Sequence, residues 1–259
     1  MSTSAQSKPL SALILTAASN YNLRGQIVGS AGGQSCPSTG DLLSCRGPHP
    51  PEDAPMKLYN ENHPAPNPRK VRIYLAEKGI DVPLQHVEIR KRQHKAPEFL
   101  AKNSLGQVPV LELDDGTHLS ESLAICRYFE ALHPAPPLFG TDPLDQALVE
   151  MWIMRVEFRI WRPVTIVWRQ ADPRTAHLGR QFTDFGEYNR GVVADEMRWL
   201  DREIGDGRAF IAGARYSMAD IVALCGLDFA KFVNMPIPEE CTALIAWRER
   251  VSARPSARA

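Results

Sequence analysis

The sequence has no excess of charge of either sign and no long hydrophobic segment. Its 259 residues carry 30 Lys and Arg against 30 Asp and Glu, so no basic field points to a nucleic-acid partner. The longest apolar runs fall far short of the roughly 18–20 residues that span a membrane as a helix. With 44% hydrophobic and 23% charged residues, the composition is that of a soluble globular protein. We therefore predict no nucleic-acid partner and no membrane partner.

Cysteine is scarce, and its spacing suits neither a disulfide framework nor a zinc site. The five cysteines are an odd number, no two form a Cys-x-x-Cys pair, and no histidine is spaced to complete a set of zinc ligands. We therefore expect reduced thiols, no metal site, and chemistry that comes from other side chains. The cysteines are Cys36, Cys45, Cys126, Cys225 and Cys241.

The first 55 residues are poor in charge and rich in small and turn-forming residues. Residues 1–55 contain 9 Ser, 6 Gly and 6 Pro but only three basic and three acidic residues. Such a segment can bury too little apolar surface to offset the entropy that it would lose on ordering. We predict a disordered extension, or a segment upstream of a true start at Met56. The apolar stretch 10–18 has the length of a secretory signal, so a secreted or envelope protein is an alternative; its weakly charged flank favours a cytoplasmic protein.

The stretch that follows contains patterns typical of an α/β unit. Asn67 before Pro68 is typical of a helix N-cap and first helical residue, and Gly79 is typical of a helix end. Asp115-Gly116 between two β-rich stretches predicts a hairpin, and residues 120–122 are expected to cap the next helix. The expected order is β-α-β-α-β-β-α, with strands at 57–59, 82–89, 106–113 and 117–119 and helices at 69–79, 97–100 and 123–129.

The remaining sequence shows helical periodicity and no strand signal. One long helical pattern covers residues 148–170, and a second lies near 175–205. Ser217 and Asp220 have the spacing of a capping box, which predicts the start of a third helix. A last amphipathic helix is marked by apolar residues at i, i+3 and i+7, namely Leu244, Trp247 and Val251.

Three ordered motifs resemble those of the cytosolic glutathione transferase superfamily, including its theta-like and bacterial Nu-class members. They lie at residues 57–79, 106–111 and 119–125, and the helical half with its capping box follows them. The resemblance implies a thioredoxin-like domain at 56–138 that binds glutathione and an all-helical domain at 139–259 that supplies the co-substrate pocket. It also implies that the protein is a homodimer.

The residues at the start of the helix after 120 suit one end of glutathione. Ser122 lies in the first helical turn, where its amide and hydroxyl can bind the γ-glutamyl carboxylate with help from the helix dipole. Glu121 is placed to take the ammonium group or the backbone of the same residue. The alternative is structural: a serine here caps the helix and Glu121 complements its dipole.

Two further segments match the rest of the tripeptide. Pro109 falls inside a β-rich run, where a proline removes a ladder donor and is otherwise expected at an edge strand. In the resembled family the Val108–Pro109 bond is cis, and the backbone before the proline pairs with the cysteinyl unit. Gln107 and His94 match positions that reach the glycyl end in theta-like members, although an exposed His is more simply a solvated loop residue.

The position that usually contacts the glutathione sulfur carries no functional group. Many members of this branch place Ser or Cys four residues before Arg69, where this chain has Ala65. Tyr59 matches a structural tyrosine of the family. The best substitute is Asn67, because the Nu class relies on an asparagine here; its side-chain NH2 can donate to a thiolate at a helix N-terminus, where the dipole already favours negative charge. The alternative is that Asn67 acts as the N-cap alone.

These observations predict an enzyme in which glutathione thiolate attacks an electrophilic small molecule. Reduction of a disulfide or peroxide with glutathione is one alternative, and a non-catalytic glutathione-binding module is another. We expect the first long helix of the second domain to line the co-substrate pocket; the alternative is a tryptophan-rich core stripe with exposed arginines. The side chains in question are Trp152, Arg155, Arg159, Trp161, Arg162 and Trp168.

Overall fold

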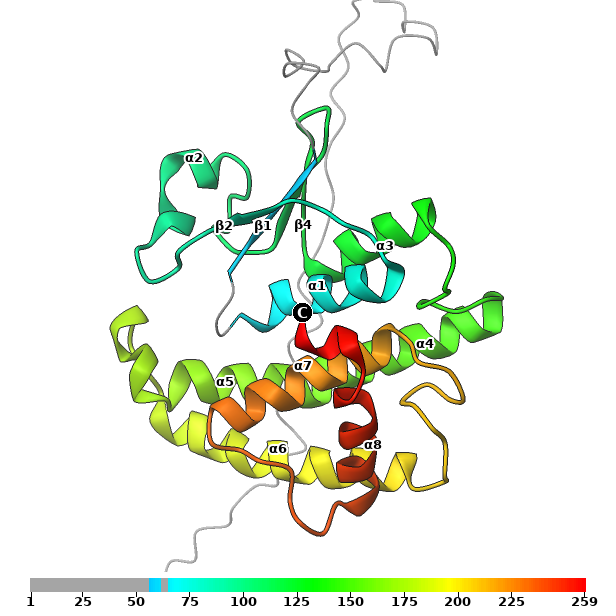
Figure 1. Ribbon diagram of the computed structural model, residues 1–259. Helices are drawn as coiled ribbons and strands as arrows, with labels where there is room; N and C mark the ends of the chain where they lie inside the picture. Colours follow the sequence, from blue (N-terminus) through cyan, green and yellow to red (C-terminus); the bar gives the residue numbers. More distant parts are fainter. Residues whose placement is uncertain (1–55, 62–64) are drawn as a thin grey trace, which may run out of the picture. The chain divides into compact units, whose positions relative to one another are not determined.

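A four-stranded sheet occupies the N-terminal part of the chain in the computed structural model, which describes residues 56–61 and 65–259 (Figure 1). The spatial order is β2-β1-β3-β4. β1 (Lys57–Asn60) is parallel to β2 (Leu84–His86), and β3 (Val110–Glu112) is antiparallel to β1 and to β4 (His118–Ser120). The predictions for residues 1–55 lie outside the described residues.

Three helices complete this α/β part. α1 (Pro66–Lys78) and α3 (Ser122–Leu132) pack against each other on one face of the sheet, between the sheet and the helices of the C-terminal part (Figure 1). α2 (Pro97–Leu100) is a single turn that follows the 3-10 segment Gln93–Lys95. The predicted order β-α-β-α-β-β-α is confirmed, and with it a fold of the thioredoxin type followed by helices.

The starts of two helices differ from the prediction. α1 begins at Pro66 with Ala65 at the N-cap, so Asn67 is in the first turn and is not the N-cap. A proline fits the first helical position because its φ is already helical and its missing N–H would have no partner there. At α3 the N-cap position is Glu121, which makes no side-chain cap, so Ser120 and Ser122 do not cap this helix. Gly79 ends α1 in the left-handed conformation, as predicted.

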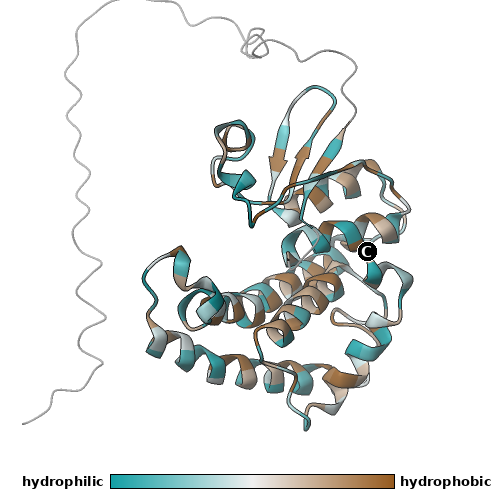
Figure 2. Ribbon diagram, turned by 60° about the vertical axis from the view of Figure 1, so that its left-hand side comes forward, coloured by the Kyte–Doolittle hydropathy of each residue, from teal (hydrophilic) through white to brown (hydrophobic). Residues whose placement is uncertain are grey.

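The C-terminal part of the described chain is helical. A long helical stretch contains α4, a π-helical turn and α5, and α6 runs back along α5. α7 lies in the middle, and its hydrophobic side chains, which Figure 2 colours brown, are nearly all buried. The elements are α4 (Pro143–Val156), the π-turn Glu157–Trp161, α5 (Arg162–Gln170), the 3-10 segment Pro173–Leu178, α6 (Thr183–Ile204), α7 (Met218–Phe232), α8 (Thr242–Ser252) and the 3-10 segment Pro255–Arg258.

The predicted capping box at the start of α7 is confirmed. The Ser217 side chain and the Asp220 side chain cap each other's backbone, and Asp220 is completely buried. Its carboxylate also accepts hydrogen bonds from the Ile211 amide at 2.8 Å and from the Trp247 indole at 2.9 Å, so it joins α7 to α8 and to the loop before α7. The box therefore fixes the centre of the helical part.

One hydrophobic core joins the α/β part to the helices. α1 packs on α7, and side chains such as Val71 and Leu224 belong to the same buried cluster. Lys70 is buried in this interface, where it pairs with Glu157 of the π-turn and lies 4.7 Å from the centre of the Trp161 ring. None of the helices in the described ranges is both long and apolar enough to cross a membrane.

Candidate active site

The strand register brings most of the predicted binding residues to one end of the sheet. Val110 pairs with Ser120 at the end of the β3–β4 ladder, so Pro109, just before β3, and Glu121, just after β4, lie next to each other at this end of the sheet. The C-terminal end of β1 lies beside the C-terminal end of β2, with Asn60 opposite His86. The loops after both strands therefore open at the same end as Pro109 and Glu121.

The segment at the start of α3 has an unusual backbone. Glu121 has φ 68° and ψ 116°, and its side chain is exposed. A non-glycine residue at positive φ costs of order 1–3 kcal/mol and persists where the surroundings impose it, most often at a binding site. Ser122 beside it is buried, and as the first residue of α3 its N–H has no partner within the helix. The two residues can therefore offer a carboxylate and a fixed donor to a ligand with both charges.

The neighbouring Val108–Pro109 bond is cis, as the resemblance implies. Both residues are buried and lie immediately before β3. Pro109 supplies no N–H, and Val108 precedes the part of the strand that pairs with β1 and β4. The backbone of Val108 is therefore outside the sheet ladder and next to Glu121 and Ser122.

The structure also packs the His94 segment against the Gln107 segment. The Lys95 ammonium donates to the Leu105 carbonyl at 2.9 Å, and a Cβ on Gly106 would lie 2.5 Å from the His94 carbonyl oxygen. His94 Nδ1 is buried without a hydrogen-bond partner among the described residues, and burial together with nearby cations lowers the pKa of His94. The Gln107 side chain is exposed.

The first turn of α1 has an unusual set of donors. Pro66 and Pro68 have no N–H, and the Arg69 N–H bonds the Ala65 carbonyl at 3.2 Å. Of the first three helical positions, Asn67 is therefore the one with a backbone N–H. Its side-chain amide adds two more donor hydrogens. The methyl group of Ala65 offers no side-chain donor, and Asn67 is not among the residues that line the cavity described below.

Tyr59 is engaged within the sheet. Its hydroxyl donates to the Glu112 carboxylate at 2.7 Å, and Lys102 and Lys57 lie 2.9 and 3.1 Å from the same group. Burial raises the pKa of Glu112, but these hydrogen bonds and one from His118 outweigh burial and lower it to about 2. The tyrosine therefore has a structural contact, which agrees with the structural role expected from the sequence.

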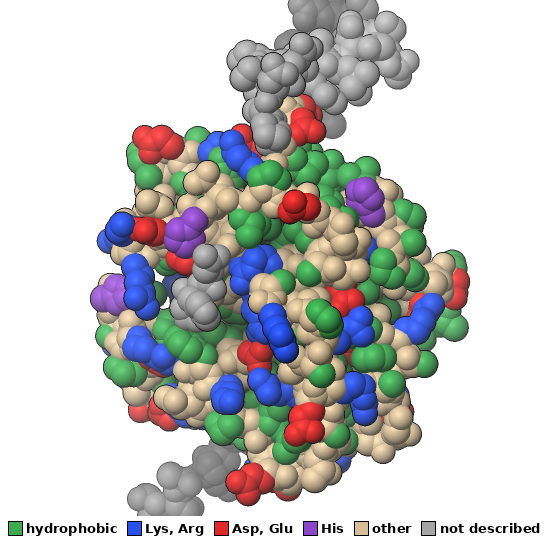
Figure 3. Space-filling view, in the orientation of Figure 1, with side chains coloured by type: hydrophobic (Ala, Val, Ile, Leu, Met, Phe, Trp, Pro, Cys, Tyr) green, Lys and Arg blue, Asp and Glu red, His purple; other side chains and the backbone are tan. Residues whose placement is uncertain are grey.

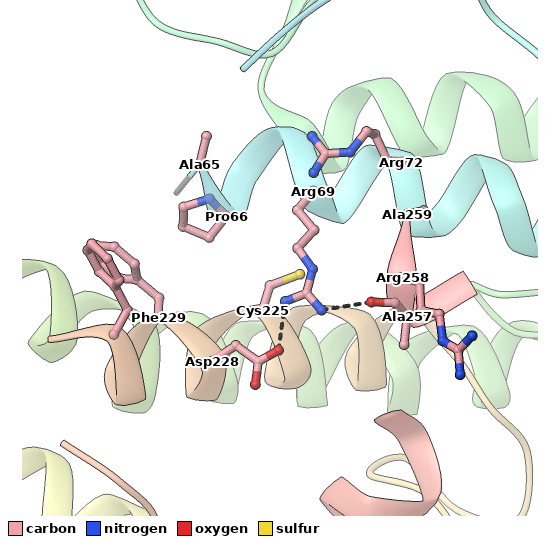
Figure 4. A pocket seen from close by; sticks show the side chains of 11 residues that line it. Ala65, Pro66, Arg69, Arg72, Cys225, Asp228, Phe229, Ala257, Arg258 and Ala259 are labelled. Atoms are coloured by element: carbon pink, nitrogen blue, oxygen red, sulfur yellow. Dashed lines mark hydrogen bonds and ion pairs between the residues drawn. The ribbon is translucent and has the colours of Figure 1, made fainter. Parts of the chain in front are cut away.

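A cavity of about 540 Å³ lies between the start of α1, α7 and the C-terminal segment (Figure 4). Ala65 and Pro66 form one wall, so the cavity begins where the sulfur is expected. Phe229 and Phe232 form an aromatic wall, and their rings stack 5.8 Å apart. Its lining residues are Ala65, Pro66, Arg69, Arg72, Cys225, Asp228, Phe229, Phe232, Ala257, Arg258 and Ala259.

The six side chains expected to line the co-substrate pocket do not line this cavity. Trp152 is buried and stacks on Trp199, while Arg155 and Arg159 pair with glutamates of α6. Trp161 and Trp168 instead pack against Phe229, behind the cavity wall. The sequence argument missed the aromatic wall and Arg72; an aromatic pair three residues apart at the end of a buried helix was the available signal.

Comparison with known proteins identifies both parts of the fold. Residues 65–132 match the glutathione S-transferase N-terminal domain, and residues 167–250 match the glutathione S-transferase C-terminal domain. Glutathione S-transferase 2 of Saccharomyces cerevisiae is 40% identical over 210 residues, which are 79% of this chain and 90% of that protein.

Solved structures give the same result. The crystal structure of Gtt2 from Saccharomyces cerevisiae superposes with a TM-score of 0.72 at 39% identity, covering 78% of this chain and 98% of that one. A glutathione S-transferase domain-containing protein of Marinobacter aquaeolei has a TM-score of 0.72 at 36% identity, covering 77% and 98%. The chain therefore belongs to the glutathione S-transferase family.

Proposed function

We propose that the protein catalyses the attack of glutathione thiolate on an electrophilic small molecule. The observation that carries the proposal is the meeting of the Glu121–Ser122 segment, the Val108–Pro109 bond and the ends of β1 and β2 at one end of the sheet. The first turn of α1 lies next to an open cavity. The names of the family's domains and of the 40% identical yeast relative support the same activity.

Each part of glutathione has a partner in this arrangement. The γ-glutamyl carboxylate binds the Ser122 amide and hydroxyl, and its ammonium binds Glu121. The cysteinyl unit pairs with the Val108 backbone in the manner of an added strand. The glycyl carboxylate accepts hydrogen bonds from His94 and Gln107.

The thiol then lies at the start of α1. The Asn67 N–H and side-chain NH2 stabilise the thiolate, and the positive end of the helix dipole lowers the thiol pKa further. Attack forms the carbon–sulfur bond and expels the leaving group with its electron pair. Because Ala65 supplies no hydroxyl, the side-chain hydrogen bond to the thiolate comes from Asn67.

The test combines one substrate of each class with variants of the two ends of the site. We expect wild type to bind immobilised glutathione and to conjugate 1-chloro-2,4-dinitrobenzene. Asn67→Ala should lower kcat by about tenfold or more, because one donor to a developing anion is worth a few kcal/mol at most, while Ser122→Ala should raise the KM for glutathione. Gln85→Ala, with an exposed side chain on β2, is the control.

Two other outcomes would change the proposal. Turnover of hydroxyethyl disulfide that exceeds conjugation and collapses in Asn67→Ala would identify a glutathione-dependent reductase, which the absence of a Ser or Cys at Ala65 makes the second candidate. Retention on glutathione resin with no turnover of either substrate, or of a peroxide, would identify a binding module.

We also propose that the chain acts as a homodimer in the cytoplasm. α4 and the π-turn expose Leu144, Leu148, Met154 and Phe158, and α3 ends at the exposed Leu132. Exposed apolar side chains grouped in this way are typical of an interface. Light scattering after size exclusion should give twice the chain mass, and Leu148→Glu with Phe158→Glu should give the monomer. Detection of the protein in the soluble fraction of its cells tests the location.

A further inference from the structure

A short stretch after α8, residues 254–259, forms one wall of the cavity, and we call it the wall segment. It includes the 3-10 segment Pro255–Arg258, and its last three residues line the cavity on the side away from Ala65 (Figure 4). Figure 1 places the wall segment at the middle of the view, where Figure 3 shows Lys and Arg side chains gathered at the surface. Arg258 is exposed. Because the outer side of the wall segment faces solvent, contacts on its inner side must fix its position.

Two of these inner contacts converge on one carboxylate at the far end of α1. The Arg254 guanidinium donates from Nε and Nη2 to the two oxygens of the Glu77 carboxylate, each at 2.7 Å, and the Ser256 hydroxyl donates to the same carboxylate. The Glu77 side chain is 10% exposed, so water competes little for these hydrogen bonds. A bidentate pair of this kind fixes direction as well as distance. Glu77 therefore holds the wall segment at its first residue and near its middle.

Further contacts complete the attachment of the wall segment. The Arg254 guanidinium carbon lies 4.1 Å from the centre of the Tyr216 ring, just before α7. Arg69, near the start of α1, donates to the Ala257 carbonyl at 2.9 Å, as a dashed line in Figure 4 shows. Burial raises the pKa of Glu77, but the hydrogen bonds that its carboxylate accepts outweigh burial and lower the pKa, so the group is ionised at pH 7. The wall segment is thus attached to α1 near both ends of that helix.

We propose that Glu77 is a positioning residue that holds the wall segment in place, so that the cavity keeps a fixed width and selects electrophiles by size. The proposal rests on the proposed function, in which the electrophile reacts beside the first turn of α1. Glu77 is not among the residues that line the cavity, so it acts through Arg254 and Ser256. A hydrophobic pocket with fixed walls discriminates between ligands that differ in size, and a wall that can move outward loses part of that discrimination.

Two electrophiles that differ by one fused ring test the size selection. 1-Chloro-2,4-dinitrobenzene and 1-chloro-2,4-dinitronaphthalene react alike: the carbon–sulfur bond forms, the carbon–chlorine bond breaks, chloride leaves with the bonding electrons, and the thiol proton goes to solvent. Each enzymatic rate is divided by the rate with glutathione alone. We expect wild type to prefer the benzene, and Glu77→Gln to lower the benzene-to-naphthalene ratio of kcat/KM by about threefold or more, with the KM for glutathione unchanged. Because both rates come from one preparation, the ratio cancels any loss of folded protein.

A second variant of the pair and a matched glutamate are the controls. Arg254→Gln should lower the ratio as Glu77→Gln does, and the double variant should lower it no further, because the two side chains form one pair. Glu240→Gln makes the same substitution in the exposed ion pair with Arg198 and should leave the ratio unchanged.

Two measurements without turnover separate this proposal from the proposed function. Hydrogen exchange of the peptide that contains residues 254–259, read by mass spectrometry, should be about tenfold faster in Glu77→Gln, as for loss of a charge-assisted hydrogen bond. Binding of 1,3-dinitrobenzene and 1,3-dinitronaphthalene needs no glutathione and no leaving group. It can be followed by quenching of tryptophan fluorescence, because Trp161 and Trp168 pack against Phe229 of the cavity.

The outcomes for the two proposals differ. Faster exchange in Glu77→Gln and a shift of its binding preference toward the naphthalene, together with no conjugation by any variant, would support the role of Glu77 and overturn the proposed function. Wild-type exchange in Glu77→Gln, or size ratios that this substitution leaves unchanged, would overturn the role of Glu77. If wild type conjugates 1-chloro-2,4-dinitrobenzene in that case, the proposed function stays in place.

Discussion

Replacing Asp220 by asparagine exchanges one oxygen for an NH2 group, and we expect this change to destabilise the protein by about 2–3 kcal/mol. The reason is the set of groups around the buried carboxylate. Oδ1 accepts from the Ile211 N–H and the Trp247 Nε1–H, and Oδ2 accepts from the Ser217 N–H and hydroxyl. All of these neighbours are donors, so the site requires acceptors on both sides.

Asparagine satisfies one side only. Its oxygen can accept the hydrogen bonds from Ile211 and Trp247, but its NH2 then faces the Ser217 N–H. These two donors repel each other, and both stay without an acceptor. The Ser217 hydroxyl can rotate to accept, which leaves one lost bond and one buried conflict at about 1–3 kcal/mol. Alanine leaves every one of these donors without a partner, so Asp220→Ala should cost about 5 kcal/mol, among the largest effects of a single substitution.

Urea unfolding at pH 7 measures the difference. Burial raises the pKa of Asp220 to about 6, although the hydrogen bonds oppose this, so the group is ionised at pH 7. Asp195→Asn is the control, because its side chain is 80% exposed and it should leave the midpoint unchanged. If Asp220→Asn unfolded at the wild-type midpoint with the same m-value, the argument from converging donors would be refuted.

Two further changes test other parts of the structure. The pKa of Glu112, lowered to about 2 by hydrogen bonds from Tyr59 and Lys102 against the effect of burial, gives stability above pH 4.5 that is lost as the pH falls toward 2. The unfolding free energy of wild type falls between pH 5 and pH 2.5, and in Glu112→Gln this fall should be smaller by about 2 kcal/mol. The same fall in both proteins would contradict this. Gly106→Ala places a Cβ 2.5 Å from the His94 carbonyl at φ +57°, so it should lower the melting temperature and raise the KM for glutathione, and a wild-type KM would argue against a glycyl site there.

Local signals in the sequence were sufficient for much of the fold. Gly79 marked the end of α1 because a left-handed residue is needed there. Ser217 and Asp220 marked the start of α7 because a capping box is complete within four residues. Features of this kind depend on neighbours in the chain, so no knowledge of the tertiary structure is needed to find them.

The cavity could not be found in this way, because its walls come from distant segments. Arg69 and Asp228 meet across 159 positions of the chain, and the Ala257 carbonyl completes the same contact. Periodicity instead pointed to the tryptophans of α4 and α5, whose spacing suits a pocket and a core equally well. In the structure α7 packs between the other helices, and Trp152 is buried in the core.

The first turn of α1 shows how three neighbouring residues can set one chemical role. Ala65 removes the side-chain donor that the family usually places there, and Pro66 and Pro68 remove the backbone donors on either side of Asn67. A helix start without prolines would offer several N–H groups to an anion, so that no single residue would dominate. Here the dipole remains, but among the first three helical positions, 66–68, the backbone N–H is left at Asn67 alone. The effect of Asn67→Ala should therefore be larger in this chain than in a relative with a serine or threonine at position 65, and restoring a serine at Ala65 should reduce it.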